Sequence, residues 1–331
     1  MRRFLRTFFV LIALLVTIYF LGPKPSAPVL EGPLPEVPSA PAALEQYILQ
    51  KEARHQLKPE NEARIIWMDS LQRKTPYSVV YLHGFSASRK EGDPVHMDFA
   101  RQFGYNLYLA RLDQHGIDTS EALLGMTASG LLRDAKEALA IGKALGEKVI
   151  LMGTSTGGTL ALALAAEYPG DVAAIINLSP NISINEAMIA MVDEPWGLEI
   201  ARLVRGGKYF EYIPENPEKA KYWYTKYRLE AVVELENLVV NTMTPETFAK
   251  VHQPVLNLYY YKNEQEQDPT VKVSAILDMH RQLGTPDSLK SAVPIPNAGA
   301  HVIGSSLTSK DIPSVETAIT QWWKAVSRNQ N

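Results

Sequence analysis

The chain has 331 residues, of which 46% are hydrophobic and 21% are charged, a composition typical of a globular protein with a sizeable core. A formal net charge of −3 gives no reason to expect a nucleic-acid partner. Because the sequence contains no cysteine, disulfides, a thiol nucleophile and metal centres built on cysteine ligands are excluded.

The N-terminus combines basic residues with an apolar run. Arg2, Arg3 and Arg6 precede residues 7–22, TFFVLIALLVTIYFLG, which carry no charge. The run is close to the minimum of about 17 residues for a spanning helix, and the bulky residues and prolines at its exit make a poor cleavage site. We therefore expect residues 1–22 to form an uncleaved transmembrane anchor, with a cleaved signal segment or a buried core helix as alternatives. The arginines should stay cytoplasmic, which places the rest of the chain on the non-cytoplasmic side, periplasmic in a bacterium.

Residues 23–42, PKPSAPVLEGPLPEVPSAPA, contain seven prolines. Proline lacks a backbone donor and favours extended polyproline conformations, so this stretch is a poor helix or strand. We expect a semi-rigid linker between the membrane and a domain that covers residues 43–331. An arm packed on the surface of that domain is the alternative.

The domain sequence alternates short apolar runs with longer helical patterns. Continuous apolar runs are typical of strands that are covered on both faces, as in parallel sheets. The runs that indicate strands are residues 63–69, 77–85, 106–113, 147–155, 172–180, 254–263 and, more weakly, 291–296. The stretches that indicate helices are residues 93–104, 129–148, 157–170 and 310–329. This alternation predicts an α/β fold with a mostly parallel central sheet flanked by helices.

One long segment interrupts the alternation. Residues 181 to about 252 contain no convincing strand and are rich in tryptophan and tyrosine. An insertion of about 70 residues is too long for a simple crossover between two strands. We expect it to form a helical cap over one end of the sheet, with most of its aromatic side chains in the core of the cap.

A serine between two glycines follows the strand at residues 147–155. Gly153-Thr154-Ser155-Thr156-Gly157 fits the pattern G-x-S-x-G and leads directly into an alanine-rich helix. In this strand–turn–helix setting a sharp turn projects the serine hydroxyl outward, and the glycines remove Cβ atoms that would collide with neighbouring backbone. The sequence therefore predicts Ser155 as a nucleophile.

A serine hydroxyl needs a base, and the base needs an orienting group. His301 follows the last strand in a loop of small residues, NAGAHVIGSS. The loop after residues 254–263 offers Glu264, Glu266 and Asp268 at the carboxyl end of a parallel strand, where open α/β sheets place their sites. We expect His301 to be the base and Asp268 the carboxylate that orients it, with Glu264 and then Glu266 as alternatives.

Two backbone amides are candidates for an oxyanion hole. The amide of Thr156 lies at a helix N-terminus, where it can stabilise negative charge, and the amide of Phe85 follows Gly84 in the sequence His83-Gly84-Phe85. Five other histidines are expected to be structural or on the surface, and they are His83, His96, His115, His252 and His280. No histidine pair has the spacing of a metal site, and neither a P-loop nor G-x-G-x-x-G is present, so we expect no metal and no cofactor.

The motifs together resemble those of the α/β-hydrolase superfamily, and specifically of the capped serine esterases and monoacylglycerol-lipase-like hydrolases. The resemblance rests on YLHGF at 81–85, GTSTGG at 153–158, DPTV at 268–271 and GAH at 299–301, in the order nucleophile, acid, histidine. It covers about residues 60–325. Of the Arg-Gly-His-Gly sequence that is frequent in this group, only His115-Gly116 is present.

The resemblance implies a Ser155–His301–Asp268 triad and hydrolysis through an acyl-enzyme. We expect a serine hydrolase that cleaves a small-molecule carboxylic ester, with an acyl or otherwise hydrophobic substrate suggested by the anchor and the aromatic cap. A peptidase, amidase or thioesterase on the same triad is an alternative, as is a membrane-anchored binding protein that has lost turnover. The sequence leaves the natural substrate and the oligomeric state open.

Overall fold

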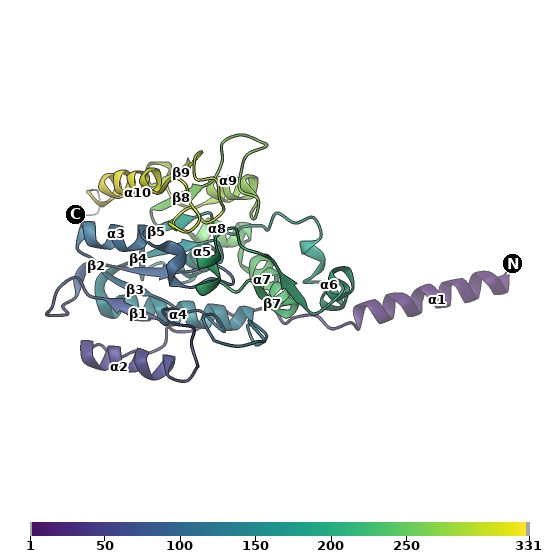
Figure 1. Cartoon of the computed structure of the whole chain (residues 1–331). Helices are drawn as coiled ribbons and strands as arrows, with labels where there is room; N and C mark the ends of the chain where they lie inside the picture. Colours follow the sequence, from purple (N-terminus) through teal and green to yellow (C-terminus); the bar gives the residue numbers. More distant parts are fainter. Residues whose placement is uncertain (1, 329–331) are drawn as a thin grey trace.

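The centre of the computed structural model, which describes residues 2–328, is a seven-stranded sheet in the order β1-β3-β2-β4-β5-β8-β9 (Figure 1). Six strands are parallel, and β1 lies antiparallel to β3 at one edge. The strands are β1 (Arg64–Ile66), β2 (Thr75–Leu82), β3 (Asn106–Leu109), β4 (Gly146–Thr154), β5 (Val172–Leu178), β8 (Val255–Tyr259) and β9 (Lys290–Pro294). All seven runs expected to form strands do so, and the expectation of a mostly parallel sheet is confirmed.

Side chains of the central strands alternate between two hydrophobic cores, one on each face of the sheet. Val80 and Leu151 contribute to one core, whereas their neighbours Val79 and Ile150 contribute to the other, and all four are fully buried. Because successive side chains of a strand point to opposite faces, a strand with a core on both sides must be apolar throughout.

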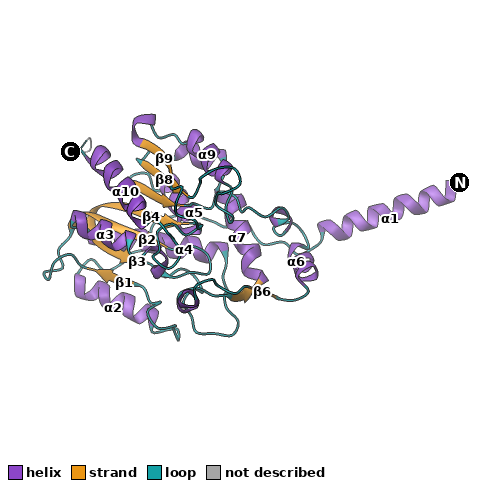
Figure 2. Cartoon of the chain, turned by 45° about the horizontal axis from the view of Figure 1, so that its top comes forward, coloured by secondary structure: helices purple, strands orange, loops and turns teal. Residues whose placement is uncertain are grey.

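Helices cover both faces of the sheet (Figure 2). On one face lie α3 (Val95–Phe103) and α10 (Ile312–Ser327). On the other lie α4 (Ala128–Leu145), α5 (Thr156–Glu167), α7 (Leu229–Thr242), α8 (Pro245–Lys250) and α9 (Val273–Gln282). The four helices expected from the sequence are present, although Asn329 of the last one lies outside the described residues. The sequence reading missed α9, a short helix whose buried residues Val273, Ile276 and Met279 recur every three positions.

A helix before the first strand was also missed. Helix α2 (Pro41–Glu52) begins at a proline and packs Leu44 and Ile48 into the core on the α4 face. At its end the Glu52 carboxylate accepts hydrogen bonds from Arg111 Nε and from the Ala63 amide, each at 2.8 Å. These bonds attach the N-terminal part of the chain to the edge of the sheet.

The proline-rich segment does not stand free as the expected spacer. Its carbonyl groups accept hydrogen bonds from the domain: the Ser26 carbonyl from Asn237 Nδ2 at 2.8 Å and the Gly32 carbonyl from the Tyr168 hydroxyl at 2.7 Å. Leu30 and Leu34 pack against the core on the α4 face. Proline removes donors but leaves carbonyl acceptors available, so the alternative of an arm packed on the domain surface describes this segment better.

The first part of the insertion after β5 forms the expected cap, but not from helices alone, whereas α7 and α8, which also lie within residues 181–252, pack with α4 and α5. It contains the 3-10 turns η2 (Ile189–Met191) and η3 (Pro217–Lys221), helix α6 (Gly197–Arg205) and an antiparallel pair, β6 (Tyr209–Glu211) and β7 (Lys226–Arg228). The expectation of no strand in this segment is therefore wrong. Three-residue strands are too short to leave a period in the sequence, and stacked aromatic rings of Phe210 and Tyr227, 5.2 Å apart, hold this pair together.

Helix α1 (Arg2–Phe20) projects away from the domain on the cap side (Figure 1). Its residues 3–20 are long and apolar enough to cross a membrane and are not buried, a property that a signal sequence near an N-terminus shares. The lack of burial contradicts the alternative of a core helix. Met1 of the expected anchor lies outside the described residues.

Candidate active site

Ser155 occupies a strained turn between β4 and α5. Its backbone has φ 53° and ψ −116°, a conformation that is rare for residues other than glycine, and it stands immediately before the first residue of the helix. The turn is fixed by hydrogen bonds from the Ser155 amide to the Leu178 carbonyl and from the Asn181 amide to the Ser155 carbonyl, each 3.0 Å long. Strand β5 thus holds the turn in place.

The two glycines of the motif make this turn possible. A Cβ atom on Gly157 would lie 1.8 Å from the carbonyl oxygen of Leu82 in β2, and one on Gly153 would lie 2.3 Å from the carbonyl carbon of Gly157. Neither backbone can move away without distorting the sheet or the helix. Helix α5 can approach the strands this closely only because both positions lack a side chain.

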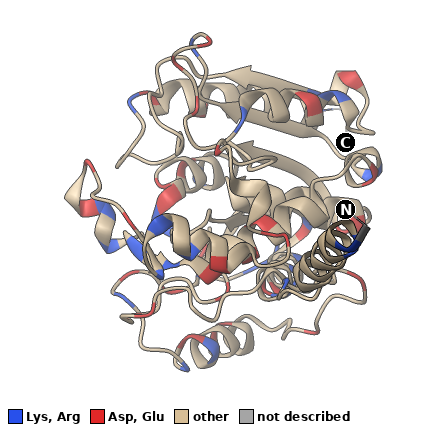
Figure 3. Ribbon diagram, turned by 90° about the vertical axis from the view of Figure 1, so that its right-hand side faces the viewer, with Lys and Arg blue, Asp and Glu red and all other residues tan. Residues whose placement is uncertain are grey.

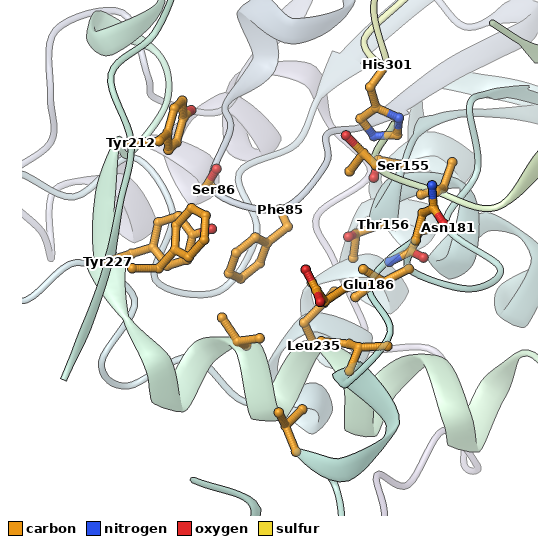
Figure 4. Close-up of a pocket in the computed structure, with 18 of the residues that line it drawn as sticks. Phe85, Ser86, Ser155, Thr156, Asn181, Glu186, Tyr212, Tyr227, Leu235 and His301 are labelled. Carbon is orange, nitrogen blue, oxygen red and sulfur yellow. The ribbon is translucent and has the colours of Figure 1, made fainter. Parts of the chain in front are cut away.

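The structure brings Asp268 and His301 together. His301 Nδ1 lies 2.7 Å from Asp268 Oδ2, and the carboxylate is almost completely buried, with 1% exposure. The ring therefore donates from Nδ1, and Nε2 is left to act as a base; this Nε2 has no hydrogen-bond partner among residues 2–328. In Figure 4 the His301 ring and Ser155 lie next to each other on the wall of a cavity.

Charge and burial oppose each other in this pair. Burial lowers the pKa of His301, but the negative charge of the Asp268 carboxylate and its hydrogen bond raise that pKa by more. The net pKa of His301 therefore lies above its ordinary value. Burial likewise raises the pKa of Asp268, but His301 and the amides of Val271 and Thr270 lower it more, so the carboxyl stays ionised at neutral pH. Both amides donate to Asp268 Oδ1, at 2.8 Å from Thr270 and 3.0 Å from Val271.

The alternative carboxylates do not reach His301. Glu264 is exposed and accepts a hydrogen bond from the Tyr261 hydroxyl at 2.9 Å, and Glu266 is exposed and pairs with Lys262. Of the three acidic residues in this loop, the structure places only Asp268 against the histidine.

The two amides expected to form an oxyanion hole are free. Neither the Phe85 amide nor the Thr156 amide donates a hydrogen bond to another residue within 2–328. The loop that carries Phe85 lies against the nucleophile, because a Cβ atom on Gly84 would be 3.1 Å from the Cβ of Ser155. A loop amide and a helix N-terminal amide on either side of Ser155 are suited to bind a developing oxyanion.

His83 and His115 brace this loop, as expected of structural residues. His83 Nδ1 donates to the Gly84 carbonyl at 2.9 Å, and its Nε2 accepts from the Leu112 amide at 3.1 Å. His115 Nε2 accepts from the Ser86 amide at 3.0 Å. Burial lowers the pKa of His83 to about 4 and also lowers that of His115, so both rings are neutral at pH 7 and can accept these bonds.

Three further histidines do not line the cavity. His96 is buried and its Nε2 contacts the Arg89 carbonyl at 2.9 Å, while His252 Nδ1 contacts the Gly284 carbonyl at 3.0 Å. His280 Nδ1 lies 3.2 Å from Asn257 Nδ2.

A cavity of about 690 Å³ lies between the sheet and the cap, and Ser155, His301, Phe85 and Thr156 all line it. Most of its wall is apolar. The cap contributes Ile189, Val192, Ile200, Val204, Phe210, Tyr212, Trp223 and Tyr227. Several aromatic residues of the cap therefore line the cavity. The sequence alone predicts most of them in the core of the cap.

A buried carboxylate in the same cavity, Glu91, was not found from the sequence. It accepts hydrogen bonds from the Gly84 amide and, at 3.3 Å, from the Tyr81 hydroxyl. Burial raises the pKa of Glu91 to about 7. The residue lies in the turn η1 (Arg89–Gly92), six residues after Phe85 and outside the YLHGF motif, so only the fold shows that it supports the loop carrying Phe85.

Comparisons with known proteins agree with this architecture. The sequence model of the S33 serine aminopeptidase family matches residues 74–259, more than half of the chain, including β2, the Ser155 turn and the whole cap. A search of curated proteins found no significant match.

Solved structures of lipolytic enzymes and esterases are similar in fold. A structure from a study of LipS and LipT, two metagenome-derived lipolytic enzymes, has a TM-score of 0.64 and 19% identity, and covers 81% of this chain and 100% of its own. A monoacylglycerol lipase from Paleococcus ferrophilus has a TM-score of 0.56 and 16% identity, and the match covers 80% of this chain and 98% of the lipase. Est1E from Butyrivibrio proteoclasticus with bound ferulic acid has a TM-score of 0.52 and 18% identity, and the match covers 80% of this chain and 95% of Est1E.

Identities this low establish the fold alone, whereas the match of the family model identifies the family. The residues matched by the family model include the strands β2, β4 and β5 and the turn at Ser155. The chain therefore belongs to the serine aminopeptidase S33 family of the α/β-hydrolase superfamily.

Proposed function

We propose that this protein is a serine hydrolase that cleaves a carboxylic ester with an apolar acyl group. The observation that carries the proposal is the 2.7 Å hydrogen bond between Asp268 and His301, which leaves Nε2 of His301 free beside Ser155 in a mostly apolar cavity. The similar lipases and esterases support an ester substrate, and the apolar wall supports a hydrophobic one.

In the proposed mechanism the Ser155 hydroxyl oxygen attacks the carbonyl carbon of the ester while His301 Nε2 takes its proton. The negative charge that develops on the carbonyl oxygen is stabilised by the amides of Phe85 and Thr156. His301 then gives the proton to the departing alcohol, which leaves an acyl group on Ser155. A water molecule, deprotonated by His301, attacks this acyl-enzyme and releases the acid.

The family description favours a second candidate, a peptidase that uses the same triad to cleave an amide bond, with an amine as the leaving group. The two candidates differ only in the leaving group, so a panel of short and long acyl esters, amides and aminoacyl anilides distinguishes them. The ester candidate predicts the highest kcat/KM for acyl esters with an unsubstituted hydrocarbon chain, because the wall of the cavity is mostly apolar.

We further propose that helix α1 anchors the enzyme in a membrane, with the hydrolase domain on the non-cytoplasmic side. The length of the helix, its lack of burial and the arginines at its start support this orientation.

Ser155 should be the residue that a fluorophosphonate probe labels. We expect stoichiometric labelling of the full-length protein in detergent, lost in Ser155→Ala and kept in Ser86→Ala, since Ser86 lines the same cavity and is the matched control. Intact mass and peptide mapping provide the measurement. Labelling that persists in Ser155→Ala would assign the nucleophile to another residue and refute the proposal.

Asp268→Asn should reduce kcat by roughly 10³-fold or more, because an amide in place of the carboxylate no longer stabilises the imidazolium or selects the correct tautomer. Glu264→Gln, in the same loop but exposed, should retain near-normal turnover. Steady-state kinetics with a soluble ester, together with circular dichroism to confirm folding, test this. Equal activity of the two variants would show that Asp268 has no role as the triad acid.

The pH profile should have an acid limb set by His301. The base must be neutral, and the pKa of His301 lies above its ordinary value of 6.5, so kcat/KM should fall as the pH is lowered through a midpoint above 6.5. Since the Asp268 carboxylate is what raises this pKa, the residual activity of Asp268→Asn should have its midpoint at lower pH. An unchanged midpoint in that variant would mean that another group controls the limb.

The membrane proposal predicts that the full-length protein stays with membranes in alkaline carbonate and that its intact mass includes residues 2–22. A chain that starts at Pro23 is the control and should be released. Release of the full-length protein, or a mature form that lacks this segment, would favour the cleaved signal.

A further inference from the structure

The end of α1 is fixed to the cap. The indole Nε1 of Trp196, the residue before α6, donates to the Ile18 carbonyl, and the Trp196 amide donates to the Pro23 carbonyl, each at 3.0 Å. Just beyond, Lys24 Nζ lies 3.8 Å from the buried Asp193 carboxylate. The cap therefore contacts the last turn of α1 directly, and no free linker separates the helix from the cap.

Helix α1 is short for a bilayer. Its 19 residues span about 28 Å, and the uncharged part from Thr7 to Phe20 only about 21 Å, against a hydrocarbon core of about 30 Å. A short span draws the residues at its ends toward the lipid. Trp196, bonded to a carbonyl inside that span, is thereby placed at the membrane interface, where tryptophan is common.

Exposed apolar side chains gather on the part of the cap next to this junction. Within residues 41–328, five of the nine large apolar side chains that are exposed lie between residues 188 and 213. They are Met188, Met191, Leu203, Val204 and Ile213. Figure 3 looks onto this side of the molecule, with α1 near the viewer, and shows basic and acidic residues together rather than a basic surface. Residues 186–228 contain seven of each, so apolar contact and not charge is the attraction available here.

Three of these five side chains also lie at the edge of the cavity. Met188, Met191 and Val204 line it, although 44%, 46% and 61% of their surfaces are exposed. A residue that both lines a cavity and faces solvent marks its opening, and the exposed charged residues Glu186 and Arg205 share this position with the three apolar ones. We call these three residues the rim; they lie in and beside η2 and α6, the elements that flank Trp196.

We propose that the rim and Leu203 dock on the lipid bilayer that α1 enters, so that an ester dissolved in the bilayer passes over the rim to Ser155 without crossing water. This rests on the proposed function and the proposed anchor, and it adds that the substrate is a membrane-resident acyl ester. Burial of these large apolar side chains in lipid favours the contact, and the tether through α1 holds the cap at the membrane, so a small apolar surface suffices for docking.

Docking can be measured apart from catalysis because the chain has no cysteine. Full-length Leu203→Cys, labelled with an environment-sensitive fluorophore and reconstituted in phosphatidylcholine vesicles, should show a blue-shifted emission that nitroxide-labelled lipid quenches. Leu71→Cys is the matched control, since Leu71 is 68% exposed in the loop between β1 and β2. A fluorophore at position 71 should keep the emission that is typical of a label in water. A water-like signal at position 203 would overturn docking.

The activity test uses Leu203→Glu, because Leu203 is 82% exposed and does not line the cavity. We expect hydrolysis of a long-chain acyl ester embedded in vesicles to fall roughly tenfold or more, in keeping with the loss of one buried leucine, while hydrolysis of a short water-soluble ester is unchanged. Leu71→Glu should change neither. An equal effect of the two variants on the vesicle ester would refute lateral entry.

Failure of the proposed function is distinguishable from failure of docking. If the wild type hydrolyses neither ester but the label at position 203 enters the lipid, the ester-hydrolase assignment is wrong and docking stands. If the soluble ester is hydrolysed and the label stays in water, the function stands and docking is wrong.

Discussion

The close approach of α5 to β2 is the constraint on which the site depends. Gly157 lies so close to the Leu82 carbonyl that no side chain fits between them, and this contact sets the position of the helix N-terminus behind Ser155. The same contact forces the sharp turn, and the strain at Ser155 is offset by its bonds to β5. Ser155 and the Thr156 amide are therefore placed by backbone packing and not by side-chain contacts that thermal motion could rearrange.

The protonation states of three buried histidines around Ser155 determine what each of them can do. His83 and His115 have lowered pKa values and stay neutral, so they can accept the backbone bonds that hold the loop of Phe85. His301 has the opposite shift, because a buried carboxylate outweighs its desolvation. Three histidines in one region thus differ in role because only one of them faces an ionised acid.

The sequence was sufficient to predict the strands of the sheet and the candidate site residues at the carboxyl ends of those strands. Seven apolar runs predicted seven strands, and the strand–turn–helix setting identified Ser155 because its geometry is encoded within five consecutive residues. His301 and Asp268 were found because parallel strands deliver their following loops to one edge. The choice of Asp268 over Glu264 as the triad acid stays a prediction, and the structure places Asp268, not Glu264, against the ring of His301.

What the sequence did not reveal was encoded in contacts between distant segments. Glu91 acts on a loop seven residues earlier through a backbone amide, and nothing in its neighbours signals this. The strands β6 and β7 are too short for periodicity, and stacking of Phe210 on Tyr227 decides their pairing. Likewise, composition alone makes the proline-rich segment look like a free spacer, because it cannot show which donors of the domain reach its carbonyl groups.

The bonds between α1 and the cap connect the chain's most apolar segment to the edge of its cavity. The segment from Ile18 to Ser26 contacts Trp196, Asp193 and α7, so the orientation of α1 in a bilayer fixes the orientation of the cap as well. A flexible linker would let the domain present any face to the membrane. Under the proposed anchoring, the face next to α1 is turned toward the lipid because the linker is packed on the domain, and that face carries the rim of the cavity.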